Sequence, residues 1–190
     1  IRSINKSENP RTIIRRNLQY DSEHQIWWTN ILKTESEEFF SILIKEGKII
    51  SIGFIRGLGK SEISYVDKAE IENLKRLKEK DYGEISLPED LLFPLNIKIY
   101  GHWCSVSGSP PEYCFQMLEL VNEKDQKQLK NWLLSFDPEI QAYGAEGLLY
   151  LEMEDIPIGE TELELIEKMK LQNNTLIKCE GCFFYVQRTV

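Results

Sequence analysis

Residues 129–151, LKNWLLSFDPEIQAYGAEGLLYL, carry the clearest structural pattern in the chain. Apolar residues recur three and four positions apart on both sides of Asp137-Pro138, which is the spacing of one face of an α-helix. An Asp followed by a Pro is typical of a helix start, because the Asp side chain can accept from free backbone N–H groups and Pro fits the first turn. The stretch therefore predicts two helices joined by a tight turn at Asp137.

The same helical spacing continues to either side. Four residues share one face of a preceding helix: Cys114, Met117, Leu118 and Val121. We expect a turn near residues 122–124, and a later helix introduced by a capping box of Thr161 and Glu164. Upstream, the charged segment 67–80 predicts an exposed helix, 82–88 a loop, and 97–106 a buried helix, with a strand as the alternative for 97–106.

Two glycines lie within the predicted helix over 140–151. Gly144 and Gly147 each cost a helix about 1 kcal/mol relative to Ala. We expect them to let an adjacent helix approach closely. On this helix we expect Leu148 to be buried and Glu146, on the opposite side, to be exposed.

A related pattern occurs 90 residues earlier in the chain. Six residues align without gaps with six of the later segment: Phe39, Ile42, Leu43, Ile50, Gly57 and Leu58 with Leu129, Trp132, Leu133, Ile140, Gly147 and Leu148. This alignment favours a second helix pair over 38–59, and a capping box of Ser22 and Gln25 predicts a short helix over 26–32. The Ile-rich sequence also fits a β-hairpin near 39–55 that turns at Glu46-Gly47.

The segment after Asp137 resembles the second helix of HEAT and armadillo repeats. Such helices commonly open with Asp-Pro, an acidic, an aliphatic and a basic residue, and then small residues and Leu. The matching residues here are Asp137-Pro138-Glu139-Ile140, then Ala142, Ala145, Gly147 and Leu148, with Gln141 in place of the basic residue. The resemblance covers 130–151 well and 38–59 weakly. It implies an all-α, right-handed α–α superhelix and a role as a binding scaffold. We expect an irregular N-terminal arm over 1–20 and a single helical-repeat domain over 21–190.

Composition excludes several function classes. The chain has 190 residues and a net charge of −8, which argues against a phosphate-binding surface and therefore against nucleic acid as a partner. No apolar run approaches the roughly 20 residues that span a bilayer. The chain begins at Ile1 rather than Met, so we expect a truncated or processed N-terminus, and both a cytoplasmic and an exported location stay open.

The cysteines are the main candidates for chemistry. Cys179 and Cys182 have a spacing that can hold a metal or form a redox dithiol. Further metal ligands could come from Cys104, Cys114 and His102. The flanking residues are apolar enough to bury the sulfurs, so we expect no catalytic residue, no cofactor and no metal. In an exported protein, Cys179 with Cys182 would be the easiest disulfide.

Together these observations predict a non-enzymatic scaffold or adaptor that holds a protein or peptide on a helical surface. The alternative is a cysteine-based metal-binding or thiol redox protein centred on Cys179 and Cys182.

Overall fold

The computed structural model describes residues 12–17, 24–33, 36–56, 60–92, 98–104, 108–171, 175–181 and 183–188. The chain divides into two compact units. Unit 1 comprises residues 1–77 and 95–97, and unit 2 comprises residues 78–94 and 98–190. The boundary between the units falls inside helix α1 (Lys68–Tyr82). The presence of α1 confirms the helix predicted for the charged segment 67–80.

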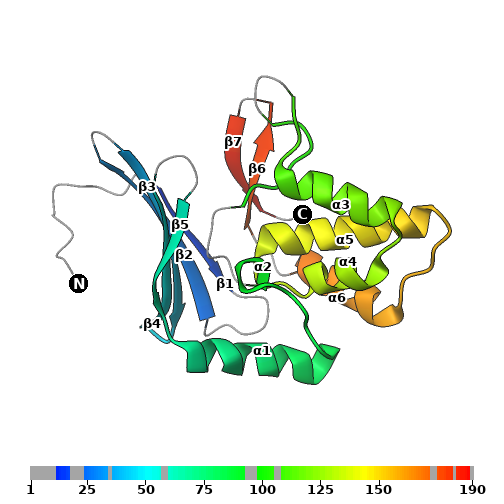
Figure 1. Ribbon diagram of the computed structural model, residues 1–190, viewed down its shortest axis with the longest axis horizontal. Helices are drawn as coiled ribbons and strands as arrows, with labels where there is room; N and C mark the ends of the chain where they lie inside the picture. The colour runs from blue at the N-terminus through cyan, green and yellow to red at the C-terminus, as the bar shows by residue number, and fades with distance from the viewer. Residues whose placement is uncertain are drawn as a thin grey trace. The chain divides into compact units, whose positions relative to one another are not determined.

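Unit 1 contains a five-stranded antiparallel sheet whose strands follow one another in chain order (Figure 1). The strands are β1 (Thr12–Asn17), β2 (His24–Lys33), β3 (Ser36–Lys45), β4 (Lys48–Arg56) and β5 (Lys60–Val66). Strands β3 and β4 form a tight hairpin at Glu46-Gly47, where φ is 48° and 78°. Positive φ at both central residues suits the right-handed twist of a hairpin.

The start of α1 is bound to this hairpin. The backbone N–H of Asp67 donates to the carbonyl of Ile50 at 2.7 Å, and Lys45 forms an ion pair with Glu70 at 2.7 Å. Leu43 and Ile50, from the two hairpin strands, are both buried.

The sheet overturns the predicted all-α, right-handed superhelix, because the chain is mixed α and β. Residues 26–32 and most of 38–59 were predicted as helix, but they lie in β2, β3 and β4. The hairpin alternative near 39–55 is the correct one, including its turn. Ile, Phe and Trp pack well on a pleated surface, so tertiary pairing overrides apolar spacing that also fits a helix.

Unit 2 is mainly helical and ends in a β-hairpin. Its elements after α1 are α2 (Glu89–Leu92), α3 (Glu112–Asn122), α4 (Gln126–Leu133), α5 (Pro138–Met153), α6 (Glu160–Leu171), β6 (Thr175–Glu180) and β7 (Phe183–Arg188). Helix α5 contacts α3, α4 and β6 and contributes much of the buried surface (Figure 1). The helices predicted around 114–121, 129–136 and 140–151 are confirmed, although α4 ends before Phe136. Helix α6 begins one residue before Thr161.

The glycines of α5 lie against α4, as predicted. A Cβ at Gly144 would lie 2.3 Å from the backbone nitrogen of Leu133 and 2.7 Å from the carbonyl carbon of Trp132. A Cβ at Gly147 would lie 2.5 Å from Cδ2 of Leu129. As residue numbers rise along α5 they fall along α4, so the two helices are antiparallel and their backbones nearly touch at Gly144.

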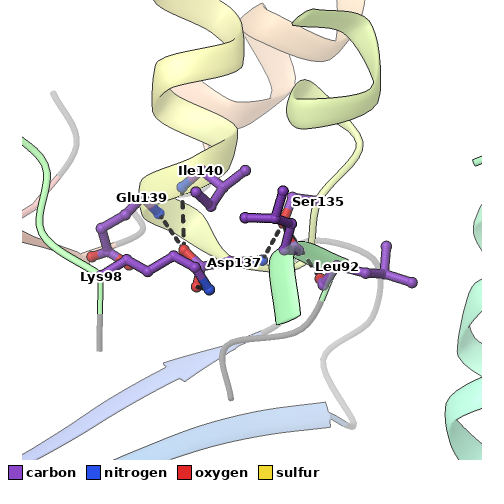
Figure 2. Close-up of polar contacts among 7 residues, drawn as sticks. Leu92, Lys98, Ser135, Asp137, Glu139 and Ile140 are labelled. Atoms are coloured by element: carbon purple, nitrogen blue, oxygen red, sulfur yellow. Dashed lines mark hydrogen bonds and ion pairs between the residues drawn. The ribbon is translucent and has the colours of Figure 1, made fainter. Parts of the chain in front are cut away.

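The start of α5 is a buried polar network (Figure 2). Asp137 accepts from the backbone N–H groups of Glu139 at 3.0 Å and Ile140 at 3.2 Å, which confirms the predicted cap. Its other carboxylate oxygen pairs with Lys98 at 3.1 Å, and both side chains are fully buried. The backbone N–H of Asp137 donates to Ser135. The charges are therefore paired and hydrogen-bonded, as buried charges must be.

Residues 98–104 are not helical, which corrects the prediction for 97–106. They form two isolated parallel bridges, Tyr100 with Lys178 of β6 and Cys104 with Gly181, the residue after β6. Within the described ranges, no helix is both long and apolar enough to cross a bilayer.

Candidate functional site

The candidate site lies in unit 2, where residues 98–104, called here the 98–104 loop, meet α3 and α5. Backbone hydrogen bonds hold the loop to β6 and to the residue after it. Tyr100 N–H donates to Ile177 at 2.8 Å, and Cys179 N–H donates to Tyr100 at 3.0 Å. Gly181 N–H donates to the carbonyl of Trp103 at 2.6 Å. A disulfide between Cys104 and Cys179, with Cα atoms 5.4 Å apart, closes the same contact covalently.

Tyr143 on α5 supports the loop from its other side. The backbone N–H of Gly101 donates to the Tyr143 hydroxyl at 2.9 Å, and that hydroxyl lies 3.0 Å from the Gly101 carbonyl oxygen. Burial raises the pKa of Tyr143, so the phenol stays protonated and can donate. Gly101 is required here, because a Cβ would lie 2.6 Å from the carbonyl oxygen of Cys179. The loop is thus fixed although it has no regular secondary structure.

The loop places His102 between a thiol and a carboxylate. Nδ1 of His102 lies 3.4 Å from Sγ of Cys114, and Nε2 lies 2.9 Å from Oε1 of Glu146. The hydroxyl of Tyr100 donates to the other Glu146 oxygen at 3.0 Å. Cys114 is the third residue of α3, and Glu146 lies in the middle of α5. Three separate segments therefore converge on one imidazole.

The protonation states follow from this geometry. An ionised Glu146 can only accept, so it favours the imidazole tautomer with the proton on Nε2 and a lone pair on Nδ1. Burial, and secondarily the negative charge of Glu146, raises the pKa of Cys114. Cys114 therefore rests as a thiol, which can donate to the lone pair of Nδ1 in that tautomer.

Burial also raises the pKa of Tyr100, with Glu146 as the second cause. Tyr100 therefore stays protonated and remains a donor to that carboxylate.

Solvent access differs across the cluster. Cys114 is 1% exposed, whereas the side chains of His102 and Glu146 are 36% and 18% exposed. The imidazole is thus the member of the cluster that reaches water most readily.

The sequence-based candidates are only partly brought together. Cys179 pairs with Cys104, whereas the pairing predicted for an exported protein was Cys179 with Cys182. Cys182 lies outside the described residues. Cys114 and His102 meet, but no group of three or more His, Cys, Asp or Glu side chains in the described segments is arranged to hold a metal.

Glu146 was missed. It was expected to be exposed on the far side of its helix, but it faces His102. Its one signal in the sequence was an acidic residue within residues 142–151, where every other residue is small or apolar.

Exposed apolar residues adjoin this cluster in the sequence. Trp103 is 70% exposed and Phe115 is 51% exposed. They directly follow His102 and Cys114, which touch each other. Leu118, one turn further along α3, is also exposed.

Searches against protein-family models, curated proteins and solved structures found no match to this chain.

Proposed function

We propose that unit 2 is a binding module that holds a protein segment on the surface formed by Trp103, Phe115 and Leu118, called here the Trp103 surface. The observation that carries the proposal is the 70% exposure of Trp103 on a loop that is fixed in place. Exposed Trp side chains are enriched among residues that dominate binding energy.

The rigidity of the loop supports this role. The disulfide and the hydrogen bonds to β6 and Tyr143 restrict the backbone around Trp103 before any partner arrives. Binding then requires little further ordering, and ordering is a main cost of association. A Trp held on a mobile loop would lose more entropy for the same buried area.

The local charge specifies the partner. Helix α3, EYCFQMLELVN, carries Glu112 and Glu119 on its exposed surface and contains no Lys or Arg. The chain as a whole has a net charge of −8. Complementary potentials select partners and accelerate association. The occupant is therefore a protein segment with an apolar side chain flanked by Lys or Arg.

The test uses a random dodecapeptide library displayed on phage, selected on the full chain, followed by synthesis of the enriched peptides. We expect enriched peptides to combine aromatic or aliphatic residues with Lys or Arg. Trp103→Ala should weaken their binding by about 2 kcal/mol or more, which is about 30-fold in Kd. Met153→Ala is the matched control, because Met153 is 79% exposed on the same unit but lies at the far end of α5.

Two results would contradict the proposal. Peptides that bind Trp103→Ala and the wild-type chain equally would place the binding site elsewhere. Enriched peptides that are acidic, or that lose affinity in Met153→Ala instead, would show that the charge argument and the chosen surface are wrong.

A further inference from the structure

We propose that Cys114, His102 and Glu146 form a nucleophilic thiol site that hydrolyses esters of apolar acyl groups. The inference goes beyond the binding role and does not rest on it. Its basis is one chain of contacts, Sγ of Cys114 to Nδ1 of His102 at 3.4 Å and Nε2 of His102 to Glu146 at 2.9 Å. A nucleophile within hydrogen-bond reach of a base, which a third group orients, is the structural signature of an activated nucleophile.

Each partner is held in the orientation that its role needs. Glu146 accepts from Nε2 and so directs the lone pair of Nδ1 toward the thiol. Tyr100 donates to the second oxygen of Glu146 and fixes the carboxylate. His102 itself lies on the loop that the Cys104–Cys179 disulfide and Tyr143 immobilise. Preorganisation of this kind distinguishes a working site from a chance contact.

Cys114 is in the first turn of α3, where the helix dipole places a partial positive charge that attracts a developing negative charge on sulfur. Glu146 opposes a standing negative charge on sulfur but stabilises the imidazolium that appears when the proton moves. The site therefore works by base-assisted attack and does not need a thiolate in its resting state.

The proposed reaction has two steps, acylation of the Cys114 thiol and hydrolysis of the S-acyl group. Nδ1 of His102 takes the proton of the Cys114 thiol while sulfur attacks the ester carbonyl carbon, which forms a C–S bond and moves the π pair to oxygen. The carbonyl re-forms, the C–O bond to the alkoxide breaks, and the imidazolium protonates that alkoxide. Water, deprotonated by Nδ1, then attacks the S-acyl group. The acid leaves and Cys114 regains its proton, so one ester and one water give one acid and one alcohol.

The surroundings specify the substrate. The buried thiol lies against the partly exposed imidazole, and the neighbouring Trp103 and Phe115 offer aromatic surface for an apolar acyl chain. Glu146 beside the reacting groups and Glu112 at the start of α3 disfavour an anionic substrate by like-charge repulsion. An uncharged ester fits these conditions.

The test is hydrolysis of p-nitrophenyl butyrate by the full chain, with trapping of the S-butyryl intermediate and its location by peptide mass spectrometry. We expect the acyl group on Cys114, and a loss of at least about 100-fold in rate for His102→Ala. Added imidazole should partly restore His102→Ala, which a purely structural role of His102 would not allow. Glu146→Gln should lower kcat more than it changes KM, because an amide can also donate to Nε2 and move the lone pair away from the thiol.

Cys114→Ser and Cys114→Ala are both needed, so that at least one folded variant, checked by circular dichroism, lacks the thiol. Cys182→Ser is the matched control for reaction at another cysteine. Hydrolysis that survives in a folded Cys114 variant would overturn the proposal. So would the absence of both acylation and iodoacetamide alkylation at Cys114 in the folded wild-type chain. Either failure leaves peptide binding at the Trp103 surface unaffected, so the two proposals fail separately.

Discussion

Replacing Gly144 by Ala tests the closest packing contact of the helical unit. The added Cβ would lie 2.3 Å from the backbone nitrogen of Leu133, 2.7 Å from the carbonyl carbon of Trp132 and 2.9 Å from the carbonyl oxygen of Leu129. Real Cβ atoms do not approach so closely, and backbone atoms cannot rotate aside. Helices α4 and α5 must therefore separate, which disturbs the buried side chains between them.

The magnitude follows from two opposing effects. Overpacking a core costs about 1–3 kcal/mol and occasionally more. The better helix propensity of Ala offsets about 1 kcal/mol of this. Because all three obstacles at Gly144 are backbone atoms, we expect the high end of the range and a net loss of about 2 kcal/mol in the free energy of unfolding.

Gly147→Ala is the matched control, on the same helix and facing the same neighbour. Its added Cβ would meet side-chain atoms only, Cδ2 of Leu129 at 2.5 Å and Cγ of Met117 at 3.2 Å. A rotamer change can relieve these contacts, so we expect a net change within about 1 kcal/mol of zero. Urea denaturation followed by ellipticity at the helix band measures both variants. A Gly144→Ala chain as stable as the wild type, or more stable, would refute the close crossing.

Three further predictions concern buried groups. Asp137 is a fully buried helix cap and one half of an ion pair, so Asp137→Ala should lower the free energy of unfolding, measured by urea denaturation, by about 3–5 kcal/mol. Asp125 is a half-buried cap on α4, and Asp125→Ala should lower it by only about 1 kcal/mol. Equal losses in the two variants would contradict the role given to burial. Burial lowers the pKa of Lys78 to about 7, whereas its unfolded value is near 10.4, so the unfolded chain binds more protons than the folded chain between these two pH values. The free energy of unfolding should therefore rise from pH 7 to 9. Lys78→Met should flatten that rise, and the same pH dependence in Lys78→Met and the wild type would contradict the lowered pKa. Peptide mapping without reductant should recover Cys104 joined to Cys179. Reduction of this disulfide should lower the free energy of unfolding by about 2–5 kcal/mol. Recovery of a different cysteine pair would show that the 98–104 loop is not held by this disulfide.

The sequence determined the helices of unit 2 because their signals are local. The spacing of residues 114–121 and 140–151 fits only a helix of that length, and the Asp137-Pro138 pair marks a start with a specific chemical cause. The role of Gly144 also follows from the sequence, since a glycine inside an otherwise strong helix needs a packing reason. These features act within a few residues of chain and need no knowledge of distant segments.

The tertiary structure alone decided the rest. Residues 39–55 have apolar spacing that fits both a helix and a strand, and only pairing with β2 and β5 on either side selects the sheet. Cysteine partners cannot be deduced from spacing, because four cysteines allow several pairings, and the bond formed joins residues 75 positions apart. The contact of His102 with Cys114 and Glu146 likewise depends on where a loop and two helices meet. From the sequence alone, a charged residue on a helix such as Glu146 is predicted to be exposed to solvent, and only the fold places His102 against it.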